Sequence, residues 1–331
     1  MTRPSSGRQR LSIITPVYAE EATVEACALK VREIMTAELA HYDYEHIFAD
    51  NSSPDDTVAT LRRLAASDPR IKVILNSRNV GPFRSAANAM RSATGAAIVP
   101  MLAADLQDPP EVIPRLVAQW EAGSLIVWGI RTNRNEGLFL RASRGLFYRI
   151  QSWSGDGTTA PPHGGEFQLI DRRVADSILS IDDQYPYIRG LVAQTGARST
   201  TVPYTWVPRS AGKSKNSFWA LADQASNGFV TTARAPSRLA LMLGLLVSVV
   251  GIVFGLVSLV WLSITRNGAA AGIPALIVGV FVLGGLQLFF IGLLGEYVLS
   301  IHGQVRRPPR MFEVERINLD TEPSDENRPM A

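Results

Sequence analysis

The sequence predicts an α/β protein, in which a parallel sheet covered by helices is followed by two membrane-spanning helices. Apolar, strand-like segments alternate with amphipathic, helix-like segments up to residue 130, and such alternation is typical of a parallel sheet. Two uncharged runs follow at 239–265 and 267–295, with Arg266 alone between them. Each run exceeds the roughly 20 residues that a helix needs to span a bilayer. These runs argue against a wholly soluble protein and against a disordered one.

The expected strands are short apolar runs bounded by turns or polar residues. They lie at 11–15, 46–49, 71–75, 96–101, 125–129, 166–170 and 200–207. The expected helices carry apolar residues three or four positions apart, as Val24, Cys27 and Val31 do. They lie at 21–39, 55–67, 85–92 and 108–121. Asp55 can cap the second helix, and the prolines at 109 and 110 suit the first turn of the fourth.

The composition excludes several classes of protein. Of the 331 residues, 46% are hydrophobic and 19% are charged, below the about 25% charged residues of an average soluble chain. The single cysteine, Cys27, excludes a disulfide framework and a Cys-rich zinc module. We expect no secretory signal, because residues 1–10 are polar and basic and Pro16 interrupts the first apolar stretch.

The two expected spans, at about 239–264 and 273–297, would form a hairpin whose flanks face the same side. The segment at 217–235 is either an amphipathic helix at the membrane surface or an ordinary packing helix. The acidic tail after Arg310 is expected to be disordered. Since basic residues flank the hairpin, the positive-inside rule places the globular part and both chain ends in the cytoplasm. The flanking basic residues are Arg209, Lys213, Lys215, Arg234, Arg238, Arg306, Arg307 and Arg310.

Acids follow three of the expected strands, at the sheet edge where parallel sheets bind their ligands. They are Glu20, Asp50 and the pair Asp105 and Asp108. One such acid can bind the base or ribose of a nucleotide, and another can hold a Mg²⁺ ion that bridges its phosphates. Each acid alone could equally be a helix cap or a solvated loop residue.

Two basic segments, at 129–134 and 209–215, could bind phosphates. The second contains Gly-Lys-Ser at 212–214, but Val207 stands where a P-loop requires glycine, so we reject that motif. This loop either attracts anionic lipid headgroups non-specifically or grips the phosphate of a particular lipid.

Taken together, these motifs resemble those of the family-2 polyprenyl-phosphate glycosyltransferases of GT-A fold, which include bactoprenol glucosyltransferases and dolichol-phosphate mannose synthase. The resemblance covers about residues 11 to 305, and DLQDPPE at 105–111 is its most specific match. The other segments are PVYAE at 16–20 (family P-V-Y-N-E), FADNSSPDDT at 48–57 (V-D-D-G-S-x-D-x-T), NVG at 79–81 (N-x-G), GEFQLIDR at 165–172 (G-D-F-R-L-x-D-R), RG at 189–190 (R-G) and RSAGKSK at 209–215 (R-x-x-G-x-S-K).

The resemblance implies a role for each candidate residue. Asp105 and Gln107 would hold Mg²⁺ or Mn²⁺, and catalysis would fall to Asp105, Arg131 and Glu166, the last as a positioning group or weak base. The residues that would bind the donor nucleotide are Pro16, Tyr18, Glu20, Asp50 and Asn79. Those that would bind the acceptor phosphate are Arg209, Lys213 and Lys215.

The resemblance also implies the organisation and the activity. We expect an inner-membrane enzyme that moves a sugar from a UDP-sugar to undecaprenyl or another polyprenyl phosphate, with inversion, for modification of a cell-envelope glycan. Its partners would be the donor, the acceptor and the bilayer, without nucleic acid, and some relatives form tetramers. The expected divisions are a disordered 1–10, a GT-A domain at 11–208, an acceptor loop and juxtamembrane segment at 209–237, two transmembrane helices within 238–299, and a basic segment with a disordered acidic tail at 300–331.

One departure from the family pattern leaves alternatives open. The family usually has D-x-D-L-Q-D, whereas Ala103 replaces the first acid here. Asp105 could suffice with substrate phosphates and waters, metal affinity could be weak, or Asp108 could compensate. A rival hypothesis is a catalytically impaired binding protein of the same fold. A processive polysaccharide synthase is disfavoured, because the sequence has no Q-x-x-R-W run and only two expected spans.

Overall fold

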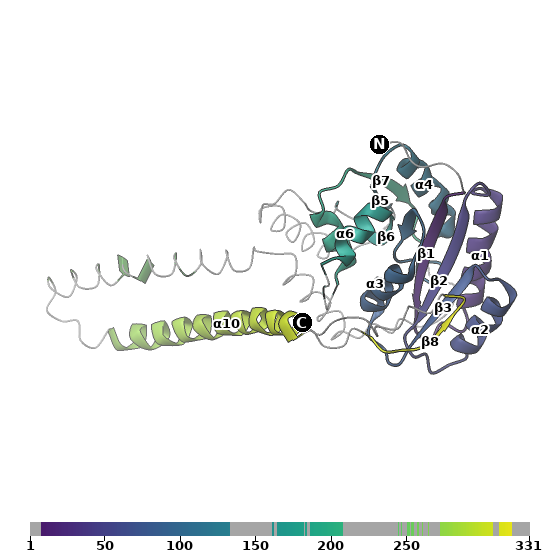
Figure 1. Cartoon of the computed structure of the whole chain (residues 1–331). Helices are drawn as coiled ribbons and strands as arrows, with labels where there is room; N and C mark the ends of the chain where they lie inside the picture. Colours follow the sequence, from purple (N-terminus) through teal and green to yellow (C-terminus); the bar gives the residue numbers. More distant parts are fainter. Residues whose placement is uncertain are drawn as a thin grey trace, which may run out of the picture. The chain divides into compact units, whose positions relative to one another are not determined.

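The structure is a computed structural model, shown in Figure 1, and two compact units are distinguished in the chain. The first comprises Met1–Arg144, Asp156–Asp223 and Pro308–Ala331, and the second Gly145–Gly155 and Gln224–Arg307. The residues that the structure describes are 8–132, 161, 164–181, 183, 186–207, 272–306 and 311–319, with scattered helical positions between 244 and 264.

A mixed, mostly parallel sheet forms the centre of the first unit (Figure 1). Within the described residues it has eight strands in the order β7-β5-β6-β4-β1-β2-β3-β8. Their bounds are β1 Arg10–Val17, β2 Asp43–Asp50, β3 Ile71–Asn76, β4 Ala97–Val99, β5 Ile126–Arg131, β6 Gly164–Asp171, β7 Ser199–Tyr204 and β8 Glu313–Ile317. β6 and β8 run antiparallel to their neighbours, and the other pairs are parallel. The predicted α/β class is confirmed, and the seven expected strands are present with ends shifted by a few residues.

Helices cover both faces of the sheet. The helices of the first unit are α1 Val24–Ala37, α2 Thr57–Ser67, α3 Pro82–Ser92, α4 Ile113–Glu121 after a 3-10 turn at Pro110–Val112, α6 Arg172–Leu179 and α7 Ile188–Gln194. Successive strand residues point to opposite faces. Ile13 therefore packs in a cluster with α1 and α4, whereas Ile14 packs in another with α3, α6 and α7. Cys27 is fully buried in the first cluster, as its place on the apolar face of its helix predicts. The short helices α6 and α7 are not among the predicted elements.

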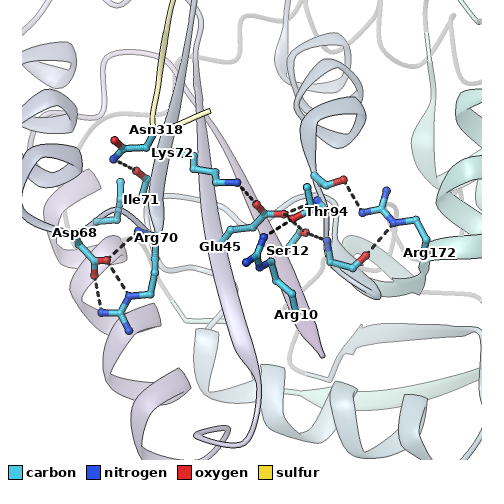
Figure 2. A network of polar contacts seen from close by, with 12 residues as sticks. Arg10, Ser12, Glu45, Asp68, Arg70, Ile71, Lys72, Thr94, Arg172 and Asn318 are labelled. Atoms are coloured by element: carbon cyan, nitrogen blue, oxygen red, sulfur yellow. Dashed lines mark hydrogen bonds and ion pairs between the residues drawn. The ribbon is translucent and has the colours of Figure 1, made fainter. Parts of the chain in front are cut away.

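A buried polar network joins the strands at their amino ends (Figure 2). Glu45 of β2 is 1% exposed and accepts hydrogen bonds from Ser12 Oγ at 2.6 Å and from Thr94 N at 2.6 Å. Lys72 of β3 also binds this carboxylate. The network lies at the end of the sheet opposite to the carboxyl ends of β1 and β2, so it stabilises the fold and leaves the other edge to the candidate site.

The strand β8 corrects the prediction of a disordered tail after Arg310. It pairs antiparallel with β3, and Ile317 packs against the apolar cluster between the sheet and α2. Its acids have cationic partners, since Glu315 binds Arg62 and Glu313 binds Arg316. The composition of the tail shows its charges. It does not show that β3, some 240 residues earlier in the chain, offers a sheet edge with which this segment can pair. Residues 320–331 lie outside the described part.

The second unit contains the helix α10, Gly272–Arg306, which has 35 residues. It includes the second expected span at 273–297. The first expected span is described only at scattered helical positions, and the segment at 217–235 lies outside the described residues. Across the described residues, no helix combines the length and the apolar character needed to cross a membrane.

Candidate functional site

The turns after β1 and β2 are joined by hydrogen bonds. Ala19 N donates to Ser53 Oγ at 2.8 Å, and Ser53 N donates to Asp50 Oδ2 at 3.0 Å. Asp50 is 1% exposed, and burial raises its pKa, although the hydrogen bonds from Ser53 oppose this rise. Ala19 and Ser52 have φ angles of 52° and 61°, which are uncommon for residues other than glycine. The hydrogen bonds hold both turns in this strained arrangement.

Glu20 extends the connection between these loops. Its backbone N donates to Thr57 Oγ1 at 3.0 Å, and its Oε2 accepts a bond from Thr23 Oγ1 at 2.9 Å. Tyr18 beside it is 38% exposed, so this edge of the sheet presents an aromatic side chain to solvent. Pro16 lies within β1, opposite Ala49 of β2. The predicted donor residues of the first two loops therefore lie at one edge of the sheet.

Asn51 connects this edge to the loop after β3. Its Oδ1 accepts bonds from Asn76 Nδ2 at 3.4 Å and from Val80 N at 3.5 Å. Asn79 is exposed, and its Oδ1 accepts a bond from Gly81 N at 2.9 Å, which shapes the turn before α3. Asn51 and Asn76 are not among the predicted site residues, because a buried amide between two strands has no distinctive sequence pattern.

Asp105 lies in the loop after β4 and is 5% exposed. Its Oδ1 accepts a bond from Gln107 N at 3.1 Å across Leu106, whose φ is 58°. Burial raises the pKa of the Cys27 thiol to about 12, a hydrogen bond from Thr15 opposes the rise, and the charges of Asp105 and Glu20 add to it. Both carboxylates therefore lie near the same buried thiol of α1.

The residues of this loop fit a metal that arrives with a substrate. Among the described residues, no group of three or more His, Cys, Asp or Glu side chains could hold a metal ion. The loop after β4 offers the carboxylate of Asp105 and the amide oxygen of Gln107 as possible ligands. Mg²⁺ commonly takes one or two carboxylates and completes its shell with phosphate oxygens and waters. This donor set suits such an ion, and it does not form a complete protein cage.

Asp108 belongs to a second, tightly connected group. Arg131 Nη2 lies 3.0 Å from Asp108 Oδ1 and 3.1 Å from Asp108 Oδ2. Tyr204 OH donates to Asp108 Oδ1 at 2.5 Å, and Arg131 Nε donates to Tyr204 OH at 3.1 Å. Because Asp108 already holds Arg131, the geometry does not favour its use as a substitute metal ligand for the missing acid at Ala103.

Glu166 of β6 lies near this group with an unusual environment. Its Oε2 is buried and has no hydrogen-bond partner among the residues that the structure describes. Burial raises the pKa of Glu166 to about 7, the cations of Arg189 and Arg131 lower it, and Asp108 raises it. Glu166 can therefore exchange a proton near neutral pH. A buried acceptor without a partner marks a place where a ligand or a water is expected to bind.

The structure brings most of the predicted site residues to one edge of the sheet. Asp105 and Gln107 share a loop with Asp108, and Asp108 connects that loop to Arg131. Tyr204 was not among the predicted residues, because its position in β7 resembles that of any alternating strand residue. Arg209, Lys213 and Lys215 lie outside the described residues.

The sequence is similar to those of known glycosyltransferases. The sequence profile "Glycosyl transferase family 2" matches residues 12–179, just over half of the chain. The prophage bactoprenol glucosyl transferase homolog of Escherichia coli (strain K12) is 31% identical over 305 residues, which cover 91% of this chain and 97% of that protein. The undecaprenyl-phosphate 4-deoxy-4-formamido-L-arabinose transferase of Klebsiella pneumoniae is 29% identical and covers 92% of both chains.

Among solved structures, the mannosyltransferase PcManGT of Pyrobaculum calidifontis in complex with GDP-Man and Mn²⁺ matches with a TM-score of 0.47. It is 20% identical and covers 68% of this chain and 63% of its own. The family of the chain is shown by the profile match and by the similarity to the Escherichia coli protein over most of both chains. The chain belongs to glycosyl transferase family 2, and it is a glycosyltransferase with an α/β fold built on a mostly parallel sheet.

Proposed function

We propose that the protein transfers a sugar from a nucleotide donor to undecaprenyl phosphate or a related polyprenyl phosphate. The observation that carries this proposal is the similarity to the bactoprenol glucosyl transferase homolog, which extends along 91% of the chain. It therefore continues beyond residue 179, where the family domain ends, into the apolar C-terminal part. The product would be a lipid-phospho-sugar with inverted configuration, for use in modifying a cell-envelope glycan.

The donor is proposed to be a UDP-sugar bound at the edge formed by the loops after β1, β2 and β3. Tyr18 offers a surface for the base, and Glu20 and Asp50 offer carboxylates for base or ribose. Asn79 would act through the turn that it shapes with Gly81. Asp105 and Gln107 would hold Mg²⁺ or Mn²⁺ together with the donor phosphates. When bound, the ion would neutralise charge on the departing nucleoside diphosphate.

The acceptor needs little activation. A phosphate monoester has a second pKa of about 6, so it is largely a dianion at neutral pH. Arg131, fixed by Asp108 and Tyr204, would stabilise phosphate charge as the bond to the sugar breaks. Glu166, with its pKa of about 7, would accept the proton of acceptor molecules that still carry one. Arg209, Lys213 and Lys215 would attract the lipid phosphate to the site.

The C-terminal part is proposed to anchor the enzyme in the inner membrane through two spans, at about 239–264 and 273–297. Support comes from the uncharged runs in the sequence and from the basic residues on both flanks. The domain at 11–208 and both ends of the chain would then lie in the cytoplasm, with 209–237 at the bilayer surface. A homo-oligomer such as a tetramer is part of the same proposal.

The test is to incubate the purified full-length protein with labelled UDP-sugars, Mg²⁺ or Mn²⁺ and undecaprenyl phosphate. A labelled lipid that contains the sugar is the expected product, and Asp105→Ala should abolish it. Asp176→Ala is the matched control, because this acid on α6 is exposed and pairs only with Arg172 in the described contacts. Failure to form labelled lipid with any nucleotide sugar would overturn the proposal.

A second candidate is a binding protein of the same fold with impaired catalysis, which Ala103 favours by leaving one carboxylate for the metal. It predicts that the protein binds UDP-sugars without turnover. Ala103→Asp should then tighten binding of Mn²⁺ in the presence of UDP. Lipid product from the unchanged protein would exclude this alternative.

A further inference from the structure

The strand β8 contacts the two elements on either side of the loop 77–81, namely the end of β3 and the second turn of α3. At the β3 end, Glu313 is paired with Asn76, and Ser77 N donates to the carbonyl oxygen of Phe312 at 2.9 Å. At the α3 end, Asn88 Nδ2 donates to Glu313 Oε1. One residue of the C-terminal strand is therefore in contact with the last residue of β3 and with the second turn of α3.

Glu313 is fixed in this position by further interactions. Its side chain is 14% exposed and pairs with Arg316, whose Nη2 donates to Glu313 Oε1 at 3.2 Å. The register of β8 shifts between Leu75 and Asn76, at the point where Glu313 is paired. A carboxylate that accepts charge-assisted bonds is held more firmly than a neutral acceptor would be. Glu313 is thus an ordered contact between two elements.

The loop between these two elements is part of the candidate donor site. Asn76, paired with Glu313, donates from Nδ2 to Asn51 Oδ1 at 3.4 Å and to Ser85 Oγ at 3.1 Å. The same Asn51 oxygen accepts a bond from Val80 N at 3.5 Å, and Asn51 follows Asp50 directly. The chain of contacts thus runs from Glu313 through Asn76 to Asn51, beside the proposed donor-binding carboxylate of Asp50.

We propose that Glu313 is a positioning residue for the nucleotide, which holds the loop after β3 in its binding conformation from the far end of the chain. The inference rests on the proposed function, since it takes the loops after β2 and β3 as the nucleotide site. Ordering a loop before the ligand arrives reduces the entropy that binding must overcome. Glu313 therefore affects how tightly the donor binds and leaves the transfer step itself unchanged.

The experiment measures the dissociation constant of UDP, by calorimetry, for the full-length protein and its variants. Glu313→Ala should weaken UDP binding about threefold to tenfold, the effect of losing one or two net hydrogen bonds. The KM for the donor should rise by the same factor, while kcat changes less than about twofold. Glu313→Gln, which keeps an oxygen that Asn88 Nδ2 can reach, should recover most of the affinity.

Glu315→Ala is the matched control. Glu315 lies on the same strand, but its partner is Arg62 on α2, and the side chains of Arg62 and Glu315 are 55% and 40% exposed. The control should bind UDP as tightly as the unchanged protein. Equal weakening by both variants would show that β8 acts only through general stability, and it would overturn the inference.

A second variant keeps the test valid even if Glu313→Ala does not fold. Asn88→Ala removes the same hydrogen bond from the side of α3. The double variant Asn88→Ala with Glu313→Ala should bind UDP no more weakly than either single variant, because each substitution removes the same interaction. If Asn88→Ala and Glu313→Ala both bound UDP as tightly as the unchanged protein, the positioning role would be overturned and the proposed function would stand. If the unchanged protein bound no nucleotide, the proposed function would fail with it.

Discussion

Replacing Glu166 by glutamine is expected to change how sugar transfer depends on pH. Burial raises the pKa of Glu166 to about 7, and its neighbours Arg189 and Arg131 keep it from rising further, while Asp108 acts in the opposite direction. An ordinary glutamate, with a pKa of about 4.3, is fully ionised in this range. If ionised Glu166 accepts the acceptor's proton, its contribution to the rate is largest between about pH 6 and about pH 7, where part of the acceptor still carries a proton.

The size of the change follows from two titrations. Between about pH 6 and about pH 8, the ionised fraction of a group with a pKa of about 7 increases about tenfold. Over the same interval the dianionic fraction of the lipid phosphate, with a pKa of about 6, increases only about twofold. The protonated acceptor on which Glu166 acts falls from about half to about 1% of the total over this interval. Glu166→Gln should therefore lose most of its activity near about pH 6 and little near about pH 8, so that its rate rises about twofold while that of the unchanged enzyme rises less.

The assay is the initial rate of labelled lipid formation at saturating donor and acceptor across this pH range, with Asp176→Asn as the control. An equally steep rise in Glu166→Gln would refute the role of this residue.

Folding stability gives an independent check of the same pKa. Folded Glu166 keeps its proton up to about pH 7, whereas in the unfolded chain it releases the proton near about pH 4.3. The folded state binds more protons between these values, so this group's contribution to stability decreases as the pH rises through that interval. Glu166→Gln should remove that decrease in denaturant titrations.

Three further predictions concern single side chains. Tyr204→Phe removes the hydroxyl that orients Arg131, and kcat should fall about tenfold while the donor KM changes little, as initial rates will measure. Ser52→Gly relieves a left-handed φ of 61° and should stabilise the fold by about 0.5–1 kcal/mol in denaturant unfolding; a loss of stability would contradict the strain. Glu45→Gln should lower the free energy of unfolding by about 1–3 kcal/mol at neutral pH and by less in acid. Burial raises the pKa of Glu45, but hydrogen bonds, led by that from Lys72, keep this pKa below its ordinary value. The contribution of the ionised carboxylate to stability is therefore lost as the pH falls through the lowered pKa. An equal loss at both pH values would refute this account.

The strands could be predicted from the sequence because burial on both faces requires continuous apolar runs. Val73, Ile74 and Leu75 are all buried, and no polar alternation interrupts them. The direction of a strand is not encoded in this way. β6 lies antiparallel between β4 and β5, although its Phe167, Leu169 and Ile170 are as fully buried as the apolar residues of the parallel strands. Direction depends on the path of the chain between strands, which periodicity does not reveal.

The candidate site could be predicted from the sequence where an acidic residue lies at the carboxyl end of a strand. Asp50 and Asp105 follow strands that neighbour β1 on its two sides, so the rule that ligands bind at strand carboxyl ends identifies them. Tyr204 and Glu313 could not be identified this way. Their significance depends on a partner distant in sequence, Asp108 for the first and Asn88 for the second. Such pairs become visible only after the sheet is assembled.

Backbone strain supports the same edge of the sheet as the working part of the molecule. Among the described residues, four other than glycine have positive φ angles, and three of them are Ala19, Ser52 and Leu106, in the loops after β1, β2 and β4. The family pattern has asparagine at the first position and glycine at the second, both residues that tolerate this conformation. This chain keeps the conformation with less suitable residues, and hydrogen bonds to Asp50 and Asp105 hold it. Strain that persists without a permissive residue indicates that the loop shape itself is required, as the proposed nucleotide site at this edge predicts.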